Sequence, residues 1–129
     1  MYKNQILGQI GENLAMNYLL KKQYEIIGKN FRCKSGEIDV IAIKGEYLVF
    51  IEVKTRSNAR YGIPSEAVTK QKRKHIYKTA KYYLYINHIE HSFVRFDVIE
   101  IYVVKNKFRI NHIKQIIWLT IENYYVVNV

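Results

Sequence analysis

The chain has 129 residues, 49% of them hydrophobic and 25% charged, which is typical of one folded globular domain and excludes a disordered chain. No apolar run is long enough to predict a membrane span, and the single cysteine, Cys33, excludes an internal disulfide framework. We therefore expect a cytoplasmic protein in a reducing compartment. The 21 Lys and Arg residues against 11 Asp and Glu residues give a net charge of +10, which favours a polyanionic partner.

A first helix is predicted over residues 4–22, where apolar residues recur at helical spacing. Gly8 and Gly11 lie within it, and each costs about 1 kcal/mol relative to alanine in a helix interior. We therefore expect them to mark a close approach to another backbone, and Glu12 beside them to face the sheet. The apolar positions are Ile6, Ile10, Leu14, Ala15, Tyr18 and Leu19.

Three strands, a second helix and two further strands are predicted after the first helix. The second and third strands form a hairpin around a turn at residues 44–46, and both are apolar on both faces, as in the centre of a covered sheet. This order predicts a single α/β (α+β) domain over residues 1–129, with helices flanking a mixed β-sheet. Residues 114–129 are a C-terminal extension to which the pattern assigns no role. The predicted ranges are 24–32, 37–43, 47–54, 65–87, 93–104 and 108–113.

Two carboxylates lie among apolar neighbours on the predicted hairpin. If Gly45 and Glu46 form a two-residue loop, Asp39 stands opposite Glu52, with Cβ atoms about 4.5–5.5 Å apart. Carboxylates this close can share a Mg²⁺ ion, and Lys54 on the same strand face would lie beside the metal-bound water. The alternative is a surface salt-bridge ladder, which such short patterns often are. The apolar neighbours favour the metal site, because an unpaired buried charge is costly.

The order and spacing of several motifs are more specific than any one of them, and together they resemble the bacterial YraN family over about residues 5–113. That family is similar to the PD-(D/E)xK nuclease superfamily, which includes restriction endonucleases and Holliday junction resolvases. One departure from the superfamily pattern is Ile38, which stands where a proline commonly precedes the aspartate. The motifs are Gly8-x-x-Gly11-Glu12-x-x-Ala15, Asn30-x-Arg32, Gly36-Glu37-Ile38-Asp39, Phe50-Ile51-Glu52-Val53-Lys54-Thr55-Arg56, Pro64-x-Glu66-Ala67-Val68 and Arg95-Phe96-Asp97-Val98.

The resemblance implies a restriction endonuclease-like core and a role for each matching residue. Asp39 and Glu52 match the metal-binding acids, and Lys54 matches the catalytic lysine. The backbone carbonyl of Val53 matches a further ligand of Mg²⁺ or Mn²⁺. Glu12 matches an acid that some members supply from the first helix, and its alternative is a helix acid paired with a nearby lysine.

Two other sets of residues are not assigned to the metal site. Asp97 lies between apolar residues on a predicted strand, and we interpret it as a structural carboxylate paired with Arg95 or Arg109. The four histidines show no metal-ligand spacing beyond His88-x-x-His91, so zinc is not expected.

Positive charge is concentrated between Lys54 and Lys81, where nine Lys or Arg residues accompany one acid, Glu66. This segment predicts a track for phosphates, although a lysine-rich helix face exposed to solvent is the alternative. Arg56 is the candidate for a bidentate phosphate contact near the scissile bond. The other candidate nucleic-acid-binding residues are Arg32, Arg60, Lys70, Arg73, Lys74 and Lys78.

Two functions of different classes are consistent with these residues. The first is a Mg²⁺- or Mn²⁺-dependent endonuclease that cuts DNA in preference to RNA and selects structure rather than sequence. The alternative is a non-catalytic nucleic-acid-binding module on the same fold, whose acids form a structural ion pair. Neither implies a membrane partner, and the analogy with resolvases suggests a homodimer.

Overall fold

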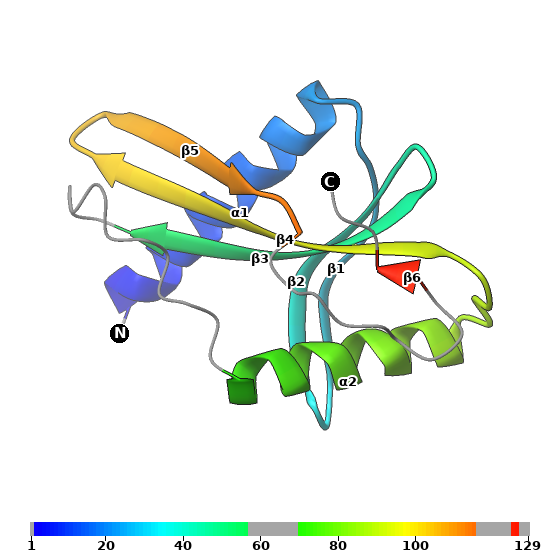
Figure 1. Ribbon diagram of the computed structural model, residues 1–129. Coiled ribbons are helices and arrows are strands. Elements are labelled where there is room, and N and C mark those ends of the chain that lie inside the picture. Colours follow the sequence, from blue (N-terminus) through cyan, green and yellow to red (C-terminus); the bar gives the residue numbers. More distant parts are fainter. Residues whose placement is uncertain (1, 57–69, 116–124, 127–129) are drawn as a thin grey trace.

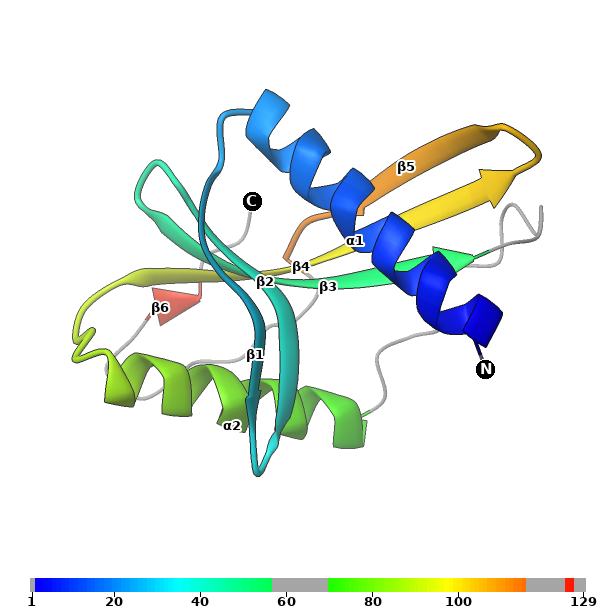
Figure 2. The same cartoon turned by 180° about the vertical axis from the view of Figure 1, so that it is seen from behind.

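The computed structural model describes residues 2–56, 70–115 and 125–126, and these form a mixed β-sheet with one helix on each face (Figure 1; Figure 2). The predicted α/β architecture is confirmed. Residues 65–69 of the predicted second helix lie outside the described residues, as do residues 57–64 before them. The helices are α1 (Tyr2–Lys21) and α2 (Lys70–Ile86). The strands are β1 (Glu25–Cys33), β2 (Gly36–Lys44), β3 (Tyr47–Arg56), β4 (Phe93–Val104), β5 (Lys107–Ile113) and β6 (Tyr125–Val126).

The strand order in the sheet is β1-β2-β3-β4-β5, and β6 also pairs with β4. Neighbours joined by short turns are antiparallel, namely β1 with β2, β2 with β3, and β4 with β5. The central pair, β3 and β4, is parallel, because α2 lies between them in the chain and returns it to the same end of the sheet. Neither described helix has both the length and the hydrophobicity needed to cross a membrane.

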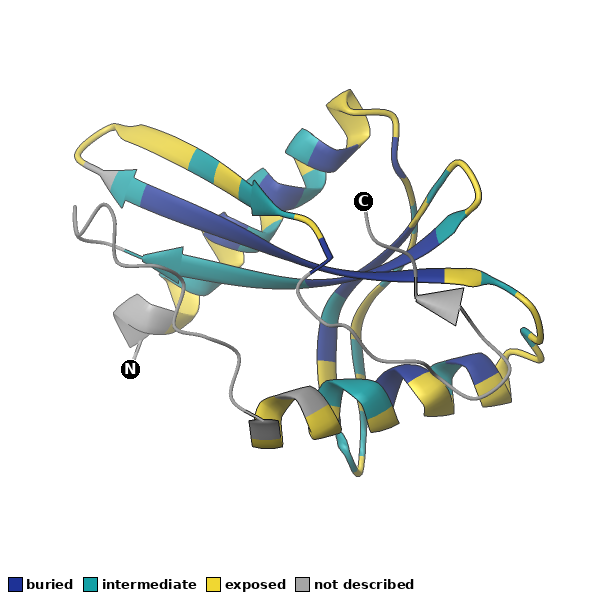
Figure 3. Cartoon of the chain, in the orientation of Figure 1, coloured by how far each residue is buried: buried dark blue, intermediate teal, exposed yellow. Residues whose placement is uncertain are grey.

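The sheet separates two apolar clusters, and β4 between them is buried along most of its length (Figure 3). Beneath α2, Phe50 of β3 stacks on Phe96 of β4 with ring centroids 5.6 Å apart, and Leu84 packs onto this cluster. Beneath α1, Ala15 and Leu19 pack onto the opposite face of the same strands. The apolar character of both faces of β2 and β3 thus reflects a sheet covered on both sides, as the sequence predicts.

The buried stripe of α1 consists of Gly11, Ala15 and Leu19, each shielded from solvent. The expectation that Ile6 and Ile10 face the core is wrong, because these side chains are 46% and 44% exposed. The helix face that contains Gly11 can approach the sheet more closely than the face that contains Ile6 and Ile10. Because the Gly11 face packs on the sheet, both isoleucines stay exposed to solvent. The close approach expected of the two glycines is found at Gly11, where the nearest atoms belong to the Thr55 side chain rather than to a backbone. The expectation is wrong at Gly8, where a Cβ would meet no atom within 4 Å.

Replacing Gly11 by alanine is expected to destabilise the fold, although alanine is the better helix former. A Cβ at Gly11 would lie 1.7 Å from Thr55 Oγ1 and 2.8 Å from Thr55 Cβ, whereas a Cβ at Gly8 would meet no atom within 4 Å. Overpacking of this kind costs about 1–3 kcal/mol or more and outweighs the gain of about 1 kcal/mol in helix propensity. Gly8→Ala is the matched control and should raise the urea midpoint that Gly11→Ala lowers. Shifts of the same sign in both variants would contradict this account.

Candidate active site

The β2–β3 hairpin has the register predicted from its turn. Gly45 adopts a left-handed conformation, with φ of 58°, which glycine accepts without strain. Lys44 pairs with Tyr47, and the ladder continues to the pair of Val40 and Ile51. Asp39 and Glu52 are the next residues on the two strands, so the hairpin brings the two predicted metal ligands to the same end of the ladder.

Asp39 lies half-buried in a cluster of negative charge. Its Oδ2 atom accepts a hydrogen bond from the Val53 backbone N–H, at 2.8 Å. Burial raises the pKa of the Asp39 carboxyl from its ordinary 3.8 to about 6; the Val53 N–H opposes this rise, and the carboxylates of Glu12, Glu52 and Glu37 add to it. Glu12 of α1 is therefore close enough to Asp39 to act on it electrostatically, in agreement with its expected orientation toward the sheet.

Glu52 makes two different contacts with its two carboxylate oxygens. Oε1 forms an ion pair with the ammonium of Lys72, which extends from α2. Oε2 is buried and has no hydrogen-bond partner among the residues that the structure describes. A pocket of about 40 Å³, whose lining includes Glu37, Glu52 and Lys72, lies over an apolar floor that includes Phe50. The pocket has room for ordered water beside the Glu52 carboxylate.

Lys54 and Arg56 follow Glu52 along the same face of β3, beside a buried acid of β4. The parallel register places Lys54 next to Glu100 and Arg56 next to Tyr102. Glu100 is 1% exposed, and its Oε1 accepts a hydrogen bond from Asn111 Nδ2 at 3.0 Å. Its Oε2 lies 3.9 Å from Arg56 Nε, so the Arg56 guanidinium is held near this carboxylate.

Glu100 and Lys72 also lie at this site, although neither is among the residues that the sequence assigns to it. The sequence does contain a signal for Glu100, since an acid within the otherwise apolar end of a predicted strand indicates a buried charge with a specific role. Lys72 carried none beyond its place in a basic segment, because its contact with Glu52 depends on how α2 crosses the sheet.

The exposed face of α2 carries two of the predicted phosphate-binding lysines. Lys74 and Lys78 are exposed, and so are Tyr82 and Tyr85 farther along the helix. Tyr83 instead packs edge-on against Phe50, so it belongs to the core. An exposed, basic helix face is the feature that a phosphate track requires.

The other predicted phosphate-binding residues are less defined. Arg32 is exposed and forms a surface ion pair with Glu37 at 2.9 Å. Lys70 and Arg73 lie on α2, but their side chains are outside the described part of the structure, as is the whole of Arg60.

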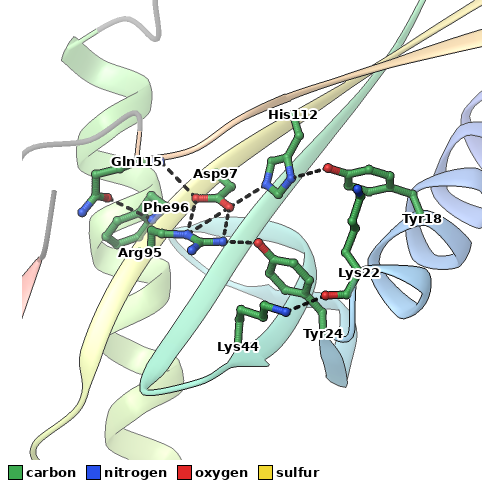
Figure 4. Close-up of polar contacts among 9 residues, drawn as sticks. All are labelled: Tyr18, Lys22, Tyr24, Lys44, Arg95, Phe96, Asp97, His112 and Gln115. Carbon is green, nitrogen blue, oxygen red and sulfur yellow. Dashed lines mark hydrogen bonds and ion pairs between the residues drawn. The ribbon is translucent and has the colours of Figure 1, made fainter. Parts of the chain in front are cut away.

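Asp97 lies in a buried polar network on the α1 side of the sheet (Figure 4). Arg95 donates to both Asp97 oxygens at 2.9–3.2 Å, and His112 Nε2 lies 2.7 Å from Oδ2. Burial alone would raise the Asp97 pKa, but the hydrogen bonds from His112, Arg95 and the Gln115 N–H outweigh it and lower that pKa below 3.8. The predicted partner Arg95 is confirmed, while Arg109 lies on β5 opposite Tyr102.

The network continues from Asp97 to two tyrosines. The Tyr18 hydroxyl lies 2.9 Å from His112 Nδ1, and Arg95 donates to the Tyr24 hydroxyl. Asp97 is therefore a structural carboxylate with both oxygens hydrogen-bonded, in contrast to Glu52, whose Oε2 has no partner among the described residues.

The two hairpin acids are the residues able to hold a cation. Over residues 2–56, 70–115 and 125–126, no three His, Cys, Asp or Glu side chains converge as a metal-binding cluster. Two carboxylates are nevertheless what a Mg²⁺ ion takes from a protein when water and phosphate complete its coordination. Glu52 Oε2 has no partner among the described residues, and burial together with the neighbouring carboxylates disfavours the charged form of Asp39, which a bound cation would favour. The residues present thus fit a hard divalent cation.

Replacing Asp39 by asparagine is expected to stabilise the protein above pH 6. The folded pKa of about 6 exceeds the ordinary 3.8 of the unfolded chain, so the folded state holds a proton that the unfolded state has lost between these values. The contribution of Asp39 to stability therefore falls as pH rises from about 3.8 to about 6, by up to about 3 kcal/mol and less where water screens the charge. The amide oxygen of the introduced asparagine would still accept the Val53 N–H.

Urea unfolding of both proteins at about pH 8 and about pH 4, without divalent cations, measures this effect. The stabilisation by Asp39→Asn should be large at the higher pH and small at the lower one. Glu46→Gln, at the exposed hairpin turn, is the control. An equal stabilisation by Asp39→Asn at both values would contradict the prediction.

Comparison with known proteins identifies the family of this chain. The model of "Uncharacterised protein family UPF0102" matches residues 11–101. The chain belongs to the UPF0102 family. This is the YraN family that the motifs resemble, and the matched segment contains Glu12, Asp39, Glu52, Lys54 and Glu100.

Curated UPF0102 relatives match over most of their length. The UPF0102 protein of Clostridioides difficile (strain 630) is 47% identical over 110 residues, which are 85% of this chain and 95% of that protein. The UPF0102 protein of Clostridium perfringens (strain 13 / Type A) is 46% identical over 113 residues, covering 86% and 93%. Among solved structures, the crystal structure of SSO0001 matches with a TM-score of 0.34 and 19% identity, over 88% of this chain and 52% of that one. This chain spans about half of that protein, and so low a likeness bears on neither site nor activity.

Proposed function

We propose that this protein is a metal-dependent endonuclease that hydrolyses phosphodiester bonds, in DNA rather than RNA, and selects structure rather than sequence. The observation that carries the proposal is the set of charged groups at the end of the β2–β3 hairpin. There Glu52 has one buried oxygen without a partner in the described part of the chain, Asp39 has a raised pKa, and Lys54 follows on the same strand face. The resemblance to the PD-(D/E)xK superfamily, whose core is restriction endonuclease-like, supports the same conclusion.

Each residue of the site has a chemical task in this reaction. Asp39, Glu52 and the Val53 carbonyl would hold Mg²⁺ or Mn²⁺, which when bound lowers the pKa of a water and stabilises charge on the phosphate. Lys54 donates hydrogen bonds that orient the attacking water against the phosphorus. The water oxygen forms the new bond to phosphorus and gives up a proton to solvent, the bridging P–O bond breaks, and the leaving oxygen takes a proton from solvent. Glu12 accepts hydrogen bonds from ordered water at the edge of the site.

Nucleic acid would reach this site along the basic face of α2. Lys74 and Lys78 are exposed there and contact phosphates without reading sequence. Arg56, held near Glu100, would bind a phosphate next to the scissile bond. We further propose a cytoplasmic location, where the free thiol of Cys33 stays reduced, and a homodimer by analogy with resolvases.

A cleavage screen tests the proposed activity. The protein is incubated with linear, single-stranded, flapped and four-way-junction DNA, and with RNA, in Mg²⁺ or Mn²⁺. We expect cleavage of at least one DNA substrate, stopped by chelation and by Glu52→Gln, a variant that removes the charge and keeps the size of the side chain. If folded protein cuts none of these substrates with either metal, the proposal fails.

One observation favours the alternative, a non-catalytic nucleic-acid-binding module. Glu52 is already paired with Lys72, so its charge could serve the fold alone. This alternative predicts salt-sensitive binding without cleavage, and a Glu52→Ala variant that changes stability and leaves the affinity for nucleic acid unchanged.

A further inference from the structure

The ion pair between Lys72 and Glu52 joins two parts of the proposed site. Glu52 lies on β3 among the metal-binding candidates, whereas Lys72 lies on α2, the helix with the proposed phosphate track. Both side chains border the same pocket. The ammonium thus sits on one oxygen of a carboxylate that a divalent cation would need.

The contact has the properties of an exchangeable pair rather than a permanent one. The Lys72 side chain is 44% exposed and the Glu52 side chain 24% exposed, and ion pairs at such positions are weak. The pair also leaves Glu52 half-satisfied, because Oε2 stays buried with no partner in the described structure. A divalent cation can bind both oxygens of a carboxylate, which a single ammonium here does not.

We propose that Lys72 is an exchangeable counter-ion of Glu52: a divalent cation displaces it from the carboxylate, and the released ammonium binds a phosphate of the nucleic acid. This inference rests on the proposed function and adds a regulatory contact to the same site. Without metal, Lys72 neutralises part of the negative charge that surrounds Asp39 and Glu52. With metal and substrate, the same ammonium neutralises a phosphate.

The exchange couples metal binding to nucleic-acid binding. When metal binds Glu52, the ammonium of Lys72 becomes available to a phosphate. When a phosphate binds Lys72, the carboxylate of Glu52 becomes available to the metal. Such a coupling is reciprocal, and metal should raise the affinity for nucleic acid by the same factor as nucleic acid raises the affinity for metal. The site would then fill with metal most readily when substrate is present.

Titration with Mn²⁺ alone tests the first half of this inference. Binding is followed by the loss of the electron paramagnetic resonance signal of free Mn²⁺, for the wild type, Lys72→Met and Lys74→Met. Removing the competing ammonium should tighten Mn²⁺ binding about three- to fivefold, as expected for a weak, partly exposed pair. Lys74→Met removes the same charge from the same helix without touching Glu52 and should change the affinity less than about twofold.

The outcomes separate this inference from the proposed function. Glu52→Gln must abolish the binding, which assigns the Mn²⁺ ion to this site. Equal affinity in the wild type and Lys72→Met, or weaker binding in Lys72→Met, overturns the role of Lys72 and leaves the proposed nuclease intact. If neither protein binds Mn²⁺, or if Glu52→Gln binds it unchanged, the metal site of the proposed function fails.

A second titration tests the coupling. A short DNA duplex is added in a Lys54→Met background, so that it is not cut, and the Mn²⁺ affinity is measured again with and without Lys72→Met. The duplex should tighten Mn²⁺ binding when Lys72 is present and have a smaller effect when methionine replaces it. An equal effect of the duplex in both backgrounds overturns the exchange.

Discussion

Replacing Asp97 by alanine is expected to lower the free energy of unfolding by about 3–5 kcal/mol, because it leaves a buried guanidinium without its carboxylate. The side chains of Arg95 and Asp97 are 3% and 0% exposed, so water cannot replace the lost partner. His112 and the Gln115 N–H lose the same acceptor. Urea unfolding followed by circular dichroism measures the loss.

Two controls test whether the loss of stability comes from the unpaired buried charge. Arg32→Ala removes the exposed ion pair with Glu37 and should cost less than about 1 kcal/mol. The double variant Arg95→Met/Asp97→Leu replaces both charges with apolar groups and should recover much of the loss. A double variant that is no more stable than Asp97→Ala would show that the other members of the network depend on Asp97 itself.

Replacing Lys54 by methionine is expected to reduce cleavage at least about a hundredfold while leaving the fold intact. Methionine keeps most of the length of the side chain and removes the ammonium that orients the water. Lys54 lies on β3 beside Glu100 of β4 and belongs to neither apolar cluster. Its replacement therefore removes no contact from the core. Single-turnover cleavage of the best substrate in Mg²⁺ measures the effect.

Lys21→Met is the charge-matched control, since Lys21 is exposed at the end of α1, and the chain after it enters β1 beside the turn of the β2–β3 hairpin, away from Glu52. It should cut at a rate close to that of the wild type. Lys54→Met should still bind the substrate and unfold at the wild-type urea concentration. Loss of cleavage together with loss of folding would give Lys54 a structural role in place of a catalytic one.

The hairpin and its acids could be predicted because the relevant information is local. A glycine at the turn sets the register, and alternation along the strands decides which residues share a face, so Asp39 and Glu52 follow from a few neighbouring positions. The helix of residues 2–21 shows the limit of the same approach. Helical spacing identifies an apolar stripe but cannot choose between the stripes of Ile10 and Gly11, and the contact with Thr55 decides it.

Contacts between distant segments could not be predicted from local patterns. The Asp97 network joins Tyr18 to His112 and Tyr24 to Arg95 across 94 and 71 residues of sequence. The pairing of Lys72 with Glu52 likewise requires the crossing of α2 over the sheet. In both cases tertiary packing, and not a local pattern, selected the partner.

The covering of the sheet by α1 on one face and α2 on the other has a consequence for variants that combine several substitutions. Ala15 lies in one apolar cluster and Leu84 in the other, and the strands between them keep the two sets of side chains apart. Destabilising changes in the two clusters should therefore add in free energy, as for independent positions. The proposed site obeys a different rule, because Glu12 comes from α1 and Lys72 from α2. The activity of this site should be lost when either helix detaches from the sheet. The temperature at which activity is lost would therefore follow the less stable of the two helix–sheet packings.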